Sequence, residues 1–61
     1  MKPKCTLVGI DGNAFAVIGA VKTALKKAGM AVEAVEWQRK AFECDSYDAL
    51  LQLAMQTVEV E

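Results

Sequence analysis

The segment Asp11-Gly12-Asn13 is the part of the sequence whose residue types and spacing come closest to a binding chemistry. It follows an apolar run, Lys4 to Ile10, that has the composition of a buried strand, and it precedes a helical pattern that begins at Ala14. A strand that turns through a glycine into a helix directs free backbone N–H groups toward the loop, which suits a phosphate or a carboxylate. Asp11, Gly12 and Asn13 are therefore the candidate residues for binding a nucleotide or a small anion.

The same three residues also have a purely structural interpretation, which we favour. The segment matches neither of the glycine-rich phosphate-binding patterns, and the carboxylate of Asp11 would repel an anion. Gly12 can supply the turn, and Asn13 can cap the helix that follows. Weak anion binding is kept as an alternative function.

Few other residues could support catalysis or metal binding. The sequence contains no histidine, which is the commonest general base and metal ligand in proteins. Cys5 and Cys44 form no Cys-x-x-Cys pair, and Asp45 and Asp48 stand where a helix cap is expected. We expect no enzyme activity, no metal and no cofactor. Reduced thiols fit a cytoplasmic location, with a Cys5–Cys44 disulfide as the alternative.

The charge balance argues against a nucleic-acid-binding protein. Seven basic and eight acidic residues give a net charge of −1, whereas domains that grip phosphates carry an excess of cations. A basic face is still conceivable and would comprise Lys22, Lys26, Lys27, Arg39 and Lys40. A solvated surface is the preferred interpretation, and low-affinity nucleic-acid binding is the alternative. The longest apolar run, Ala14 to Val21, is too short to span a bilayer, so we expect no membrane role.

The hydrophobic patterning predicts one domain over residues 1–61. The chain is 54% hydrophobic and 25% charged, a composition typical of a folded globular protein. Helical periodicity covers residues 14–28, 31–43 and 47–56, and strict alternation over residues 57–61 predicts a second strand. We therefore expect an α/β (α+β) fold in the order strand, helix, helix, helix, strand. The terminal strands should pair, with the three helices packed on one face. The pairing is parallel if successive elements alternate in direction.

Each predicted element has an expected buried face. The expected sets are Ala14, Ile18, Val21, Leu25 and Ala28 in the first helix; Ala31, Ala34, Val35, Ala41 and Phe42 in the second; Tyr47, Leu50, Leu51, Ala54 and Met55 in the third; and Val58 and Val60 in the last strand. Gly19 lies inside the first helix, where a glycine usually marks the close crossing of another element.

Three large apolar residues fall outside these faces. Phe15, Trp37 and Leu53 lie off the main stripe of their helices, so they are the candidate residues for contact with an unknown protein partner. The open edges of a two-stranded sheet also invite pairing, which predicts a homodimer formed through strand edges. The expected function is thus that of a protein-interaction or regulatory domain without catalysis.

Several segments resemble a group of small bacterial proteins of unassigned activity, some of them on mobile elements. The resemblance rests on Val8-Gly9-Ile10-Asp11-Gly12-Asn13-Ala14-Phe15 near the start and on Val58-Glu59-Val60-Glu61 at the end. This chain has Cys44-Asp45-Ser46 where that group has Ser-Gly-Asp before the tyrosine, so the helix cap there can differ. The resemblance implies a bacterial, cytoplasmic protein and supplies no functional residues.

Overall fold

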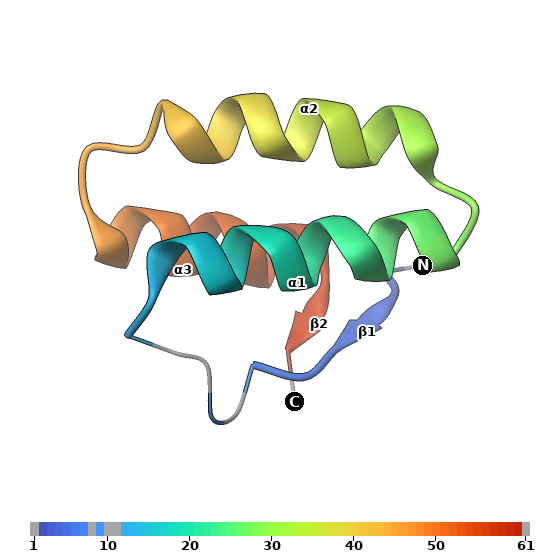
Figure 1. Cartoon of the computed structure of the whole chain (residues 1–61), viewed down its shortest axis with the longest axis horizontal. Coiled ribbons are helices and arrows are strands. Elements are labelled where there is room, and N and C mark those ends of the chain that lie inside the picture. The colour runs from blue at the N-terminus through green and yellow to red at the C-terminus, as the bar shows by residue number, and fades with distance from the viewer. Residues whose placement is uncertain (1, 8, 10–11, 61) are drawn as a thin grey trace.

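Two short strands and three helices make up the fold. The computed structural model describes residues 2–7, 9 and 12–60. The elements are β1 (Lys4–Cys5), α1 (Ala14–Lys27), α2 (Ala31–Phe42), α3 (Tyr47–Thr57) and β2 (Glu59–Val60). The two strands pair in parallel, with Lys4 opposite Glu59 and Cys5 opposite Val60, as Figure 1 shows. The predicted α/β class, element order and parallel pairing are confirmed.

Local hydrogen bonds and a glycine turn set the boundaries of α1. At its start, the Oδ1 of Asn13 accepts a hydrogen bond from the backbone N–H of Ala16 at 3.2 Å. At its end, Gly29 adopts a φ of +78°, which only glycine reaches without strain. The N–H of Met30 then donates back to the carbonyl oxygen of Leu25 at 2.9 Å and closes the helix.

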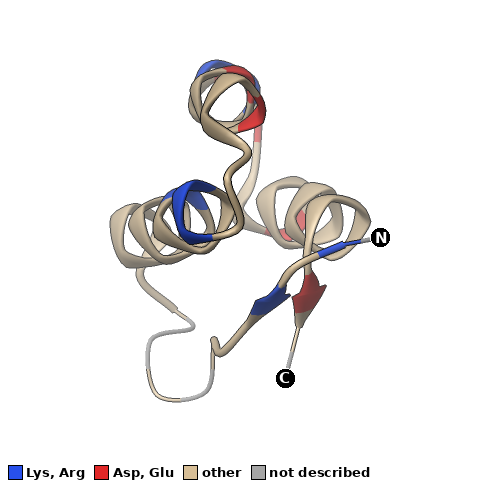
Figure 2. Cartoon of the chain, turned by 90° about the vertical axis from the view of Figure 1, so that its right-hand side faces the viewer, with Lys and Arg blue, Asp and Glu red and all other residues tan. Residues whose placement is uncertain are grey.

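The helices lie on one side of the strands but form two layers. Helix α1 contacts β1 and helix α3 contacts β2, whereas α2 packs on α1 and α3. Figure 2 views this arrangement along the helices and places α2 on the far side of α1 and α3 from the strands. Helices α1 and α3 therefore pack directly on one face of the strands, as predicted, and α2 packs on the outer side of these two helices.

The core lies between these layers and is apolar throughout. Its buried members come from every element and its flanks: Cys5, Leu7, Val17, Ile18, Val21, Leu25, Ala34, Trp37, Ala41, Leu50, Ala54 and Val58. Trp37 is the largest of them, and its indole Nε1 donates to the backbone oxygen of Ile18 at 3.0 Å. This bond satisfies the polar atom of the indole ring inside the core.

Both strands are shorter than the sequence pattern predicts. The N–H of Val58 still donates to the carbonyl oxygen of Ala54 at 2.9 Å, so the pairing with β1 begins only at Glu59. Val58 is fully buried, but Val60 is 38% exposed and was wrongly expected to point into the core. The predicted strand residues Val8, Ile10 and Glu61 lie outside the described residues.

The predicted buried face of α2 is only partly right. Ala34 and Ala41 are buried as predicted, but Ala31 is exposed, Val35 is 65% exposed and Phe42 is 58% exposed, and Trp37 is buried in their place. Two apolar stripes compete on this helix, and packing selects the one that buries the large indole between two small alanines. Periodicity alone cannot distinguish two such stripes.

Three smaller expectations are corrected as well. Met55 of α3 is 53% exposed, and Ala28 is exposed because α1 has already ended at Lys27. A Cβ added at Gly19 would meet nothing within 4 Å, so no element of the described part of the chain crosses closely there. The backbone of α1 at Gly19 is instead bordered by open space.

Candidate functional site

The loop before α1 uses its polar groups for structure. Gly12 has a φ of +98°, and its N–H donates to the hydroxyl oxygen of Tyr47 at the start of α3. Asn13 is engaged as the N-cap through Ala16. Asp11 lies outside the described residues. Two of the three candidate anion-binding residues thus have the structural tasks expected of them, and anion binding stays a prediction.

The three candidate partner residues do not lie together on one surface. Phe15 is 75% exposed, as an interface residue requires, but Trp37 is only 2% exposed. The expectation that Trp37 contacts a partner is therefore corrected: its indole fills the space between α1 and α2 and bonds to Ile18. Leu53 is half-buried and packs against the core from α3.

Further exposed apolar residues lie on α2, which packs against the helix that carries Phe15. Val32 is 70% exposed, and it lies on the same side of α2 as the exposed residues Val35 and Phe42. Helix positions i, i+3 and i+10 fall within about 80° of one another around the axis, although they are spread along its length. The ring of Phe42 lies 6.3 Å from that of Phe15, measured between centroids, in a tilted arrangement. We call Phe15, Val32, Val35 and Phe42 the α1–α2 apolar face.

A hollow of about 290 Å³ opens beside the two phenylalanine rings. Its walls include Ile18 from α1, Leu50 and Tyr47 from α3, and Asp45 from the connection between α2 and α3. Aromatic rings that border a partly apolar hollow can receive an apolar side chain from a partner. The hollow extends the α1–α2 apolar face toward the N-terminal ends of α1 and α3.

The five cations of the predicted basic face are dispersed. Lys27 lines a groove together with Lys4 of β1, and Arg39 lies 3.8 Å from the carboxylate of Glu43. Lys22 and Lys26 follow Phe15 at helical spacing along α1. In Figure 2, α1 carries only basic residues, α3 carries only acidic ones and α2 carries both, so the cations of α2 stand beside acidic residues. Nucleic-acid binding is left as an untested alternative.

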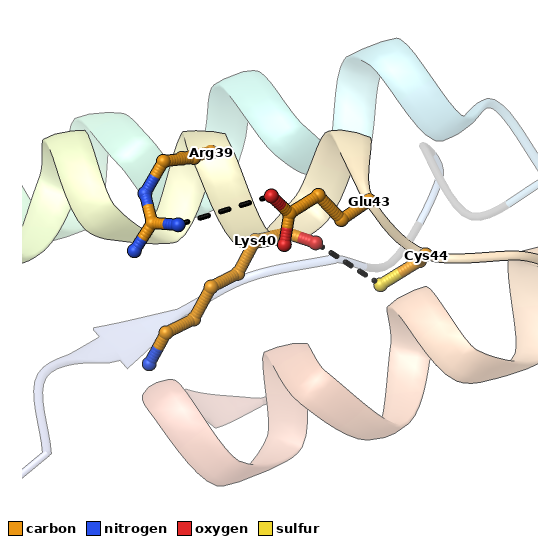
Figure 3. A network of polar contacts seen from close by, with 4 residues as sticks. All are labelled: Arg39, Lys40, Glu43 and Cys44. Carbon is orange, nitrogen blue, oxygen red and sulfur yellow. Dashed lines mark hydrogen bonds and ion pairs between the residues drawn. The ribbon is translucent and has the colours of Figure 1, made fainter.

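The C-terminal end of α2 carries a small polar cluster, drawn in Figure 3. The side chains of Arg39 and Glu43 point toward one another, and the Cys44 thiol lies 3.5 Å from the carbonyl oxygen of Lys40. Both members of the ion pair are more than 60% exposed, so the pair contributes little to stability.

Both cysteines are free thiols, so the structure contains no Cys5–Cys44 bridge. Cys5 is buried in β1, and this burial raises the pKa of its thiol above the usual value of 9.0. A raised pKa keeps the thiol protonated near neutral pH and makes it a poor nucleophile. The structure thus gives Cys5 the character of a core residue.

Comparison with known proteins gives no family assignment. No protein-family model matches the chain, and no match was found among curated proteins or solved structures. The resemblance to small bacterial proteins therefore stays a prediction. Within residues 2–7, 9 and 12–60, no helix is long and apolar enough to cross a membrane. In the same part of the chain, no three potential metal ligands cluster.

Sequence reasoning identified one member of the α1–α2 apolar face and missed three. Val35 and Phe42 were assigned to the core, and Val32 was not considered. The available signal was the presence of two apolar stripes on a helix that can bury only one of them. An excess stripe of this kind marks a surface available to a partner.

Proposed function

We propose that this chain is a protein-interaction domain that binds a partner through the α1–α2 apolar face. The observation that carries the proposal is the exposure of four large apolar side chains on one side of the helix pair, each at least 58% accessible. Single exposed apolar residues are ordinary on protein surfaces, but a contiguous patch usually marks a binding site.

The aromatic pair is the expected centre of the interface. Phe15 and Phe42 lie in tilted contact and border the hollow of about 290 Å³. Large aromatic residues beside a pocket commonly dominate the binding energy of protein interfaces. An apolar side chain of the partner would enter this hollow, while Val35 and Val32 extend the contact along α2.

The test is affinity purification of the full chain from a bacterial lysate, compared with two variants. The double variant Phe15→Ser/Phe42→Ser removes the aromatic centre, and Met55→Ser is the matched control because Met55 is 53% exposed on α3. We expect a stoichiometric partner, identified by mass spectrometry, with the parent chain and with Met55→Ser but not with the double variant.

Two outcomes would contradict this proposal. Retention of the same partner by the double variant would place its binding site elsewhere on the surface. Native mass spectrometry that finds a nucleotide or a nucleic acid in place of a protein would favour one of the alternative functions. Folding of each variant is verified by circular dichroism before binding is compared.

A further inference from the structure

The open edge of β1 borders a second surface feature, separate from the α1–α2 apolar face. The sheet has the order β1-β2, so β1 has a strand on one side only among the described residues. Along its other side lies a groove of about 510 Å³ between β1 and α1. Figure 2 shows α1 standing beyond β1 on the side opposite β2, so the helix overhangs this edge.

The backbone of β1 is oriented to pair along the groove. The N–H of Glu59 donates to the carbonyl oxygen of Pro3 at 2.8 Å, and Lys4 is the register partner of Glu59. In a parallel ladder, alternate residues direct their backbone groups to opposite sides. The N–H and C=O of Lys4 therefore face away from β2 and toward the groove, which Thr6 also lines.

The helix wall of the groove leaves room for another backbone. Ala16, Gly19, Ala20 and Thr23 line it, and all of them are small. The space beside Gly19 is open, since a Cβ there would meet no atom within 4 Å. An added strand lies about 4.8 Å from its neighbour, so it needs a shallow wall of this kind beside the edge.

The charges of the groove select its occupant. Lys4 lines it from the strand and Lys27 lines it from α1, and none of the described residues that line it is acidic. We propose that this groove binds an extended, acidic segment of a partner protein, which adds to β1 as a third strand. Main-chain hydrogen bonds would supply affinity, and a carboxylate placed near Lys4 and Lys27 would supply selectivity.

A second copy of the chain fits the groove less well. Pairing of β1 with β1 of another copy would bring Lys2 and Lys4 close to the same cations of that copy, and like charges opposite one another destabilise a ladder. Pairing with β2 of another copy would match Glu59 to Lys4. However, that contact repeats head to tail and produces a ring or an open filament rather than a closed dimer.

The experiment titrates the ¹⁵N-labelled full chain with two short peptides, both acetylated and amidated. In one peptide valine alternates with glutamate, and in the other it alternates with lysine. We expect the amides of Lys4 and Thr6 to shift and to gain protection from exchange. The glutamate peptide should bind at least about tenfold more tightly than the lysine peptide. Equal affinities, shifts confined to the α1–α2 apolar face, or silence at millimolar peptide would overturn the proposal.

Variants distinguish this groove from the surface in the proposed function. Gly19→Leu fills the groove without loss of helix stability and should weaken the glutamate peptide by about tenfold or more. Lys4→Glu/Lys27→Glu should reverse the preference between the two peptides. Phe42→Ser should leave peptide binding unchanged, because Phe42 does not line the groove.

Two further results would also overturn the proposal. One is full affinity for the glutamate peptide in Gly19→Leu. The other is concentration-dependent assembly of the parent chain that Gly19→Leu abolishes, which would assign the groove to a second copy.

Discussion

Trp37 fixes how α2 sits against α1. Its indole is 2% exposed, and its Nε1 donates to Ile18 across the helix pair. The flanking residues Ala34 and Ala41 are small enough for the indole to lie between the helices. One side chain thus decides which of two apolar stripes on α2 is buried and which remains for a partner.

Replacing Trp37 with phenylalanine should destabilise the fold measurably. The variant loses the hydrogen bond to Ile18 and leaves unfilled volume, which together cost about 1–3 kcal/mol. Urea unfolding followed by circular dichroism measures this loss. A variant as stable as the parent chain would show that the indole does not anchor α2.

Cys5 makes the stability of the fold depend on pH above the usual thiol range. Burial raises the pKa of Cys5 above 9.0, so the native state favours the protonated thiol. This contribution is fully present below the unfolded-state pKa and is lost as the pH rises toward the native one. Between about pH 7 and about pH 10, the parent chain should lose more stability than Cys5→Ala.

Cys44→Ala is the control for this comparison, since Cys44 is only partly buried and is not a member of the buried core. Unfolding curves of the three proteins at both pH values measure the difference. If Cys5→Ala lost as much stability as the parent chain, the burial of Cys5 would have no effect on its titration.

At the scale of the elements, α1 is a capped helix with an unfilled position on its surface. Asn13 and Gly29 set its ends through side-chain and backbone hydrogen bonds. Gly19 has no packing partner for the side chain it lacks. A glycine inside a helix lowers the stability of the helix, and no close packing contact at Gly19 in the described structure offsets this loss.

Gly19→Ala should stabilise the protein. Alanine favours an exposed helix interior by about 1 kcal/mol over glycine, and its Cβ would enter open space. Thermal unfolding of the variant should show a higher Tm. A lower Tm would reveal a close contact at Gly19 that the fold does not show.

At the scale of the whole molecule, the core and the apolar surface are separate. The chain exposes 4020 Å², close to the roughly 3,900 Å² expected for a folded monomer of this mass. The domain therefore buries an ordinary share of its surface without a partner. The residues of the α1–α2 apolar face contribute little to that burial.

The double variant Phe15→Ser/Phe42→Ser should consequently be as stable as the parent chain. Exposed substitutions of this kind change the unfolding free energy by less than about 0.5 kcal/mol each, apart from the contact between the two rings. Chemical denaturation measures this directly. A large loss of stability would mean that the aromatic pair belongs to the core, and it would weaken the proposed function.

The sequence by itself determined the elements and their order. Asn13 was predicted to cap α1 and does so, and a cap was expected just before α3, where the Oγ of Ser46 accepts from the N–H of Ala49 at 3.1 Å. These signals are local, because a cap or a glycine turn depends only on residues a few positions away. The parallel pairing of β1 with β2 followed from the number of helices between them.

Only the tertiary structure decided which surfaces are buried. Val35 and Phe42 are as apolar as many core residues, yet α2 buries Trp37 and leaves these two side chains exposed. The length of β2 likewise depended on Val58, whose N–H stays bonded to α3. The small core can bury only some of the apolar helix faces. Which faces it buries depends on how the side-chain volumes of different elements fit together, and a local sequence pattern does not contain that information.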